Sequence, residues 1–202
     1  MQLFGQMARV PVTARQKFAE AAYFYNGMGA HRNNPVIFPY YLSAFVSALR
    51  SVTYYLQKQY AYDSRFTDWY AKKQDEMRAD PVLKMLHDKR NIALHLEPFD
   101  LHFRQSFKMP EKYGGVISTN HLELKQEEDD TGRLRMILTV GQDGTPEEVE
   151  PLISWHFSEN DPEDVMNHCY AGLQRMDAIL TELSSLGLDK SESQPDRGPA
   201  SC

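Results

Sequence analysis

Apolar residues recur every three or four positions through most of the first hundred residues, which is the spacing of an amphipathic helix. The pattern predicts a first helix over 14–31, opened by a capping box between Thr13 and Gln16. A longer helix is predicted from Asn34 to about residue 60, because a capping residue there precedes a proline at the first helical position. Its core-facing stripe is predicted to be Phe38, Leu42, Phe45, Leu49, Val52 and Leu56.

Three more helices follow from the same signals. A short one spans about 66–77, and a fourth runs from Asp80, again followed by proline, to Pro98. The last helix is predicted over 162–186, with Asp164 in a capping-box position. Its buried stripe is predicted to be Val165, Cys169, Leu173, Met176, Leu180 and Leu183.

Between the fourth and last helices the hydrophobic period changes to two. Residues 99–115 are interpreted as a connection. Three alternating runs, at 121–125, 133–140 and 153–157, predict short strands, and the polar stretches between them predict turns. We therefore expect a small antiparallel meander, the β insertion 116–157, before the last helix.

The element order predicts a mainly α chain, α+β overall, with one domain over 1–186. Its helical bundle comprises residues 13–97 and 162–186, and the polar tail 187–202 is predicted to be disordered. A length of 202 residues and 42% hydrophobic content allow one buried core. Two cysteines exclude a disulfide framework. No apolar stretch suits a membrane span or a secretory signal, so a cytoplasmic protein is expected.

The net charge of −6 conceals an asymmetry along the chain. Residues 1–98 hold 13 Lys and Arg against 8 Asp and Glu, whereas residues 99–202 hold 9 against 20. The positive half can therefore still bind a nucleic acid. We expect the acidic region 127–150 either to lie away from that surface or to cover it as an anionic mimic of RNA.

Polar side chains gather on one side of the fourth helix. His87, Asn91 and His95 form a ladder at i, i+4 and i+8. Arg90 lies at the edge of the apolar stripe, where a guanidinium requires a partner or a function. Arginine offers a planar fork to a phosphate, and histidine exchanges a proton near neutral pH. This set suits RNA cleavage through the ribose 2′-hydroxyl, a reaction that requires no metal.

The segment from Arg90 to His95 resembles the R-N-x-x-x-H form of the HEPN motif, and residues 41–51 resemble the second helix of HEPN domains. The resemblance covers about residues 13–97. It implies a HEPN-like helical bundle that forms a homodimer, in which two motifs meet in one cleft. Such domains act as metal-independent endoribonucleases, commonly in toxin–antitoxin or phage-defence systems.

On this resemblance Arg90 binds the scissile phosphate, His95 is the general acid or base, and Asn91 positions one of them. Two departures stand out. Glu97 occupies a position where some HEPN toxins carry a tyrosine that their antitoxin modifies, and the β insertion is absent from the minimal bundle.

Four further residues are predicted to bind substrate: Arg50, Lys84, His87 and Lys89. Arg50 also shares a polar strip with Ser43, Ser47 and Tyr54, which we interpret as a dimer seam. The histidines lack the spacing and the cysteine companions of a metal site, so neither a metal nor another cofactor is expected.

Two alternatives stay open. In the first, the same groove belongs to a non-catalytic HEPN-like module that binds RNA, a nucleotide or a partner protein such as an antitoxin. In the second, the motif is a coincidence, Arg90 pairs with Asp88, Glu97 or an acidic residue of the second half, and His95 caps a bundle end. An Arg90 sealed in an intrachain salt bridge would rule out the nuclease.

Overall fold

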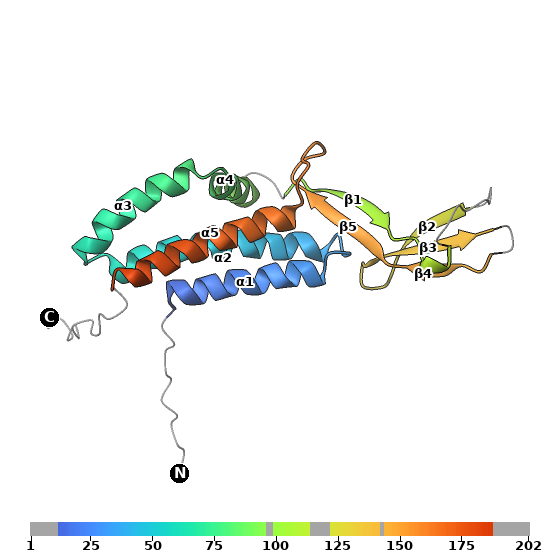
Figure 1. The fold of residues 1–202 in the computed structure, drawn as a ribbon, viewed down its shortest axis with the longest axis horizontal. Helices are drawn as coiled ribbons and strands as arrows, with labels where there is room; N and C mark the ends of the chain where they lie inside the picture. Colours follow the sequence, from blue (N-terminus) through green and yellow to red (C-terminus); the bar gives the residue numbers. More distant parts are fainter. Residues whose placement is uncertain (1–11, 96–98, 114–121, 142–143, 188–202) are drawn as a thin grey trace, which may run out of the picture.

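The computed structural model of the chain describes residues 12–95, 99–113, 122–141 and 144–187. The helices are α1 (Ala14–Ala30), α2 (Ile37–Tyr60), α3 (Ser64–Ala79), α4 (Pro81–His95) and α5 (Val165–Ser185). Between α4 and α5 lie β1 (His102–Phe107), the short 3₁₀ helix η1 (Glu111–Tyr113), β2 (Leu122–Glu128), β3 (Leu134–Val140), β4 (Glu147–Val149) and β5 (Pro151–His156). The molecule is elongated, with the helices at one end and the strands at the other (Figure 1). The mainly helical, α+β class is thus confirmed, whereas the predicted tail 187–202 falls almost wholly outside the described residues.

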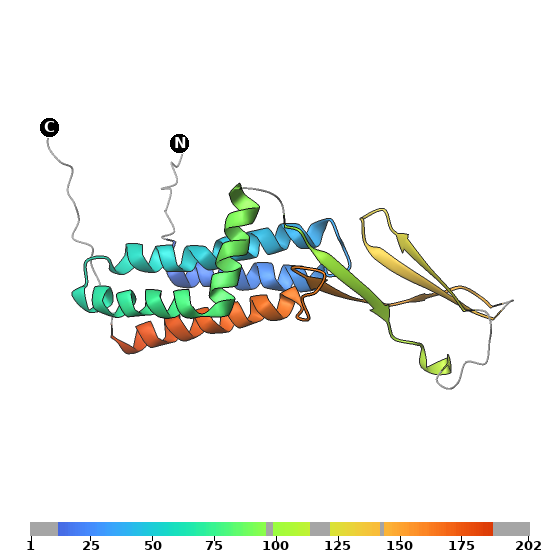
Figure 2. The same cartoon turned by 90° about the horizontal axis from the view of Figure 1, so that it is seen from above.

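The helical bundle is held by the apolar faces of α1, α2 and α5, which run alongside one another (Figures 1 and 2). Every member of the two stripes predicted for α2 and α5 is buried in this core. Burying one Leu or Phe side chain contributes roughly 1.5–3 kcal/mol relative to leaving it exposed. α3 adds Phe66 and Tyr70, whose rings stack with centroids 5.0 Å apart.

Polar caps fix where the helices begin. Thr13 and Gln16 form the predicted capping box. The Asn34 side chain accepts two backbone N–H groups at the start of α2, at 3.0 and 2.9 Å. The Asp164 carboxylate accepts a backbone N–H of α5 at 2.8 Å. α5 therefore begins just after Asp164, later than the predicted residue 162, because Asp164 rather than Asp161 caps it.

The strands form two antiparallel sheets, so the prediction of a single meander is wrong. β2, β3 and β4 make a three-stranded meander, whereas β5 pairs with β1 and sets Trp155 opposite Phe103. The interpretation of 99–115 as a connection is also wrong, because this segment contains β1, and the β region starts before residue 116. Only two of the six β1 residues are even partly buried, so the strand depends on a partner that lies far along the chain.

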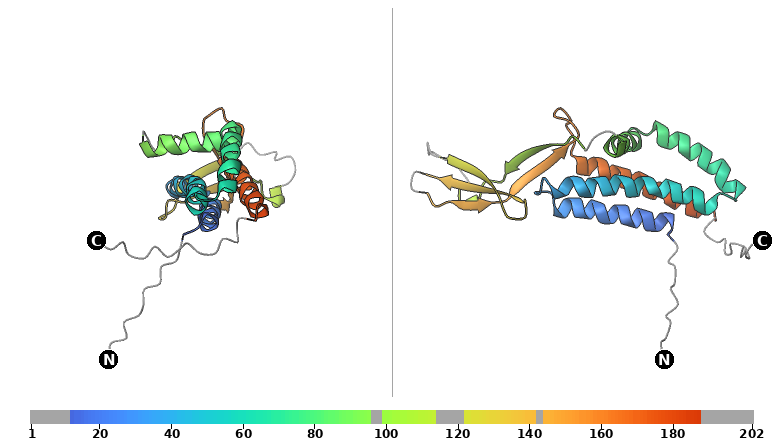
Figure 3. Two further views of the ribbon diagram at one scale, coloured as in Figure 1. Left: turned by 90° about the vertical axis from the view of Figure 1, so that its left-hand side faces the viewer. Right: turned by 180° about the vertical axis from the view of Figure 1, so that it is seen from behind.

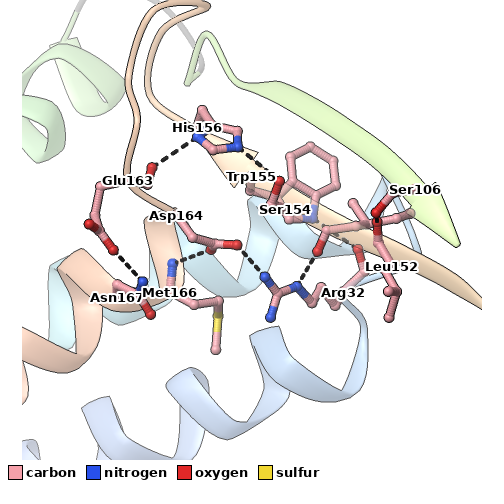
Figure 4. A network of polar contacts seen from close by, with 11 residues as sticks. Arg32, Ser106, Leu152, Ser154, Trp155, His156, Glu163, Asp164, Met166 and Asn167 are labelled. Carbon is pink, nitrogen blue, oxygen red and sulfur yellow. Dashed lines mark hydrogen bonds and ion pairs between the residues drawn. The ribbon is translucent and has the colours of Figure 1, made fainter. Parts of the chain in front are cut away.

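The strands are joined to the bundle at the connection between α1 and α2 (Figure 4). Arg32 donates to the Ile153 carbonyl and to the Asp164 carboxylate. The Arg32 carbonyl accepts the indole N–H of Trp155 at 2.9 Å. The Trp155 ring stacks on Phe38 of α2, with centroids 4.5 Å apart and planes 7° from parallel. This junction ties β5, the start of α5 and the bundle core together.

Buried His156 belongs to the same network (Figure 4). Its Nδ1 lies 2.9 Å from the Glu163 carbonyl oxygen, and its Nε2 lies 2.9 Å from the Ser154 hydroxyl. A carbonyl can only accept, so Nδ1 donates to Glu163, and Nε2 forms a hydrogen bond with the Ser154 hydroxyl. Both ring nitrogens have a hydrogen-bond partner, which assigns His156 a structural role.

Candidate functional site

α4 crosses the bundle instead of aligning with it (Figure 2). Gly172 of α5 permits the crossing, because a Cβ atom there would lie 2.6 Å from Leu86 Cδ1 and 3.2 Å from Leu49 Cδ2. Leu86 is buried at this contact. Beyond it the C-terminal part of α4, which carries Arg90 and Asn91, extends past the side of the bundle (Figure 3, left).

Asp80 fixes the start of α4, as its cap-plus-proline sequence predicts. Its Oδ1 accepts the N–H groups of Val82 and Leu83, both at 2.9 Å, and its Oδ2 accepts from Arg175 Nε of α5 at 2.5 Å. Burial raises the pKa of the Asp80 carboxyl, but the Leu83 N–H and the Arg175 guanidinium outweigh burial and leave the pKa lowered.

We expect Asp80→Asn to destabilise the protein by about 1 kcal/mol at neutral pH, because asparagine still caps α4 but loses the partly exposed ion pair. The folded-state pKa is the lower one, so the carboxylate stabilises above about pH 4 and this contribution disappears as the pH falls through the folded pKa. Urea unfolding should therefore separate the variant from wild type at pH 7, and the difference should shrink as the pH is lowered below about 4. Asp75→Asn, which changes an exposed pair with Arg78, is the control and should have little effect. A difference that persists at low pH would contradict the assignment.

Arg90 forms no ion pair with a carboxylate among the described residues. Its Nη1 donates to Asn91 Oδ1 at 3.1 Å, and its Nε is buried without a hydrogen-bond partner. Asp88, one of the partners considered from sequence, instead accepts from Lys84 at 2.9 Å. Glu97, the other, lies outside the described residues. Asn91 thus contacts Arg90, one of the two residues that it was expected to position, and the guanidinium retains donors for an anion.

The imidazole that contacts Asn91 is that of His87. Asn91 Nδ2 lies 3.4 Å from both ring nitrogens of His87, and His87 Nδ1 lies 3.4 Å from Asp88 Oδ1. His95 is the last residue of α4, and its side chain lies outside what the structure describes. The role of His95 therefore stays a prediction from sequence.

A groove of about 470 Å³ lies between α2, α3 and α4, and we call it the α4 groove. It brings together three predicted substrate-binding residues, Arg50, Lys84 and His87, above an apolar floor that includes Leu83 and Met176. Arg50 also donates to the Thr53 hydroxyl. Among the groove residues missed from sequence are Gln57, Tyr70, Gln74 and Arg78. Gln74 and Arg78 stand at i, i+4 on α3, but nothing local in the sequence places α3 beside α4.

Lys89 lies away from the α4 groove. Its Nζ donates to the Phe157 carbonyl at 3.2 Å and lies 5.0 Å from the centroid of the Phe157 ring. This contact holds α4 against the segment between β5 and α5. The structure thus places Lys89 in an anchoring contact and does not bring it to Arg50 and Lys84.

Other chemistry is sparse in the described segments. Within them, no three His, Cys, Asp or Glu side chains gather closely enough to hold a metal ion. Burial raises the pKa of the Cys169 thiol, which packs in the core as expected. No described helix is long and apolar enough to cross a membrane.

Residues 6–107 match the family of bacteriophage lambda protein ea47, and this stretch is half of the chain. The chain belongs to the lambda ea47 family. No curated protein and no solved structure matches it. The ea47-family segment contains α1 to α4 and β1, and therefore every predicted site residue from Arg50 to His95. Among the described residues that line the α4 groove, only Met176 comes from outside this segment.

Proposed function

We propose that this ea47-family protein is a metal-independent endoribonuclease of the HEPN type, with its reaction centre beside the α4 groove. The observation that carries the proposal is the state of Arg90. Its guanidinium is held by Asn91, is unpaired with any described carboxylate, and lies on the helix that supplies Lys84 and His87 to a basic groove. A guanidinium of this kind can bind two oxygens of a phosphate group.

In the proposed reaction the ribose 2′-oxygen attacks the neighbouring phosphorus while a base takes its proton. The bond from phosphorus to the 5′-oxygen breaks, and an acid returns a proton to that oxygen. The products are a 2′,3′-cyclic phosphate and a 5′-hydroxyl, so no co-reactant is consumed. Arg90 would stabilise the charge that develops on the phosphate oxygens, His95 would transfer a proton, and Arg50 and Lys84 would hold neighbouring phosphates.

The test is incubation of the purified full chain with single-stranded RNA in excess EDTA, followed by analysis of the product ends. We expect cyclic phosphate ends, and a rate about 10²–10⁴-fold lower for His95→Ala, the usual contribution of a proton-transfer group. His102→Ala changes a half-exposed histidine on β1 and should cleave normally. Equal rates for wild type and His95→Ala would contradict the proposal.

The non-catalytic module is the second candidate, because the floor of the α4 groove is apolar. Val46, Leu83 and Met176 line it, and Lys84 is partly neutralised by Asp88. Such a floor suits a nucleobase or a partner side chain more than a phosphate. Saturable RNA or nucleotide binding without cleavage, lost in Arg50→Ala, would favour this module over the enzyme.

A further inference from the structure

β2 lies at the edge of the three-stranded sheet and is exposed along its whole length. Among the described strands only β3 pairs with it, and all seven of its residues are exposed. The sheet lies at the end of the molecule farthest from the helical bundle (Figure 1). An edge strand presents unpaired backbone N–H and C=O groups to another strand.

Two leucines of β2 extend the apolar face of this sheet to its free edge. Leu122 lies opposite Val140, and Leu124 lies opposite Leu138. Directly opposed residues of an antiparallel pair project from the same face. Leu138 is fully buried in a cluster that Phe107 helps to cover, whereas Leu122 and Leu124 are 47% and 40% exposed. The residues that bury Leu138 therefore do not cover Leu122 and Leu124, which continue the same apolar face at the sheet edge.

We propose that β2 pairs antiparallel with β2 of a second copy of this chain, in a register centred on Leu124. The two three-stranded sheets then become one sheet of six strands. Each Leu124 lies opposite its counterpart, and each Leu122 lies opposite Gln126 of the other copy. The uncovered leucines of the two copies thereby form one continuous apolar strip.

Charge selects this register. Glu123 and Lys125 lie on the other face of β2, with Lys125 Nζ 3.2 Å from Glu123 Oε1 in the same chain. In the register centred on Leu124, each Glu123 faces a Lys125, so the four charges alternate in sign along and across the strands. Centring on Lys125 would set like charges opposite one another, which destabilises a sheet. Centring on Gln126 would set Leu124 against Glu128.

This interface is separate from the proposed RNA site. β2 runs roughly along the long axis of the molecule, so antiparallel pairing puts the two helical bundles at opposite ends of the assembly (Figure 1). The two α4 grooves do not meet there. The inference is therefore independent of RNA cleavage and of any dimer made through the helices.

Charge exchange tests the pairing. We expect the full chain to self-associate in sedimentation equilibrium, and Glu123→Lys or Lys125→Glu alone to raise the dissociation constant about tenfold or more, because two attractive pairs become repulsive. The double variant Glu123→Lys with Lys125→Glu should restore wild-type affinity. A wild-type chain that remains monomeric, or single variants that associate as wild type does, would overturn the proposal.

Cross-linking tests the register. In a Cys202→Ser background, Leu124→Cys should form a disulfide-linked dimer on mild oxidation, because directly opposed Cα atoms lie within disulfide range. Gln126→Cys, on the same face, is the matched control and should remain uncross-linked. A dimer linked through residue 126 and not through residue 124 would overturn the register.

Discussion

Arg90→Met is expected to abolish RNA cleavage and, at the same time, to stabilise the fold. The guanidinium is the proposed phosphate ligand, and loss of such a group costs about 100-fold or more in rate. Yet Arg90 Nε is buried without a partner, and an unsatisfied buried donor costs roughly 1–3 kcal/mol. Methionine keeps much of the apolar stem and removes that donor. The free energy of unfolding should therefore rise by up to about 1 kcal/mol.

Lys89→Met is the matched control, because it makes the same kind of change one residue earlier. Unlike Arg90 Nε, Lys89 Nζ has partners, because it contacts both the carbonyl and the ring of Phe157. We expect normal cleavage and a small loss of stability, about 1 kcal/mol. Cleavage should therefore be lost only in Arg90→Met, whereas the free energies of unfolding of the two variants, measured in urea, should change in opposite directions. A stable Arg90→Met variant that cleaves RNA normally would exclude Arg90 from the reaction.

Trp155→Ala is expected to cost about 3–5 kcal/mol, which is a large share of the stability of a domain of this size. The indole is buried, stacks on Phe38 and donates to the Arg32 carbonyl. Alanine would leave a cavity where β5 meets the bundle and an unpaired carbonyl beside it. We also expect faster limited proteolysis between β1 and β5, because the strands lose their attachment before the helices unfold.

Trp155→Phe separates the two contributions at this junction. Phenylalanine keeps an aromatic ring against Phe38 and removes only the indole N–H, so the loss should be nearer 1 kcal/mol. Thermal unfolding followed by circular dichroism measures both variants. Equal losses for Phe and Ala would mean that the hydrogen bond, and not the stacked ring, holds the junction.

The helices could be predicted from sequence because their signals are local. Thr13, Asn34 and Asp80 cap the helices they precede, and the stripes of α2 and α5 repeat at the helical period. β1 could not be predicted, because its pairing with β5 depends on residues far along the chain. The Arg32 junction was equally hidden, since an arginine in a polar connection gives no sign that it joins a strand carbonyl to a helix cap.

The candidate site divides in the same way. The spacing of His87, Arg90 and Asn91 was visible in one helix, and their contacts follow from it. That Arg50 of α2 lines the α4 groove with His87 depends on where α4 crosses, which Gly172 of α5 permits. Lys89 instead contacts Phe157, in the segment between β5 and α5. The helical pattern of α4 does not predict where that segment lies.

The β1–β5 ladder has a consequence for how the chain tolerates change in length. The ladder runs from the pair His102 and His156 to the pair Phe107 and Pro151. It therefore holds together the two ends of the segment that connects α4 to α5. Whatever lies between Phe107 and Pro151 is then a loop whose ends are already held together. Doubling the length of such a loop costs only about 0.6 kcal/mol in closure entropy. The ea47-family match stops at residue 107, the last residue of β1. Insertions within this loop should therefore cost the helical bundle little, as long as Leu134, whose N–H donates to the Asn33 carbonyl, keeps its place in the core.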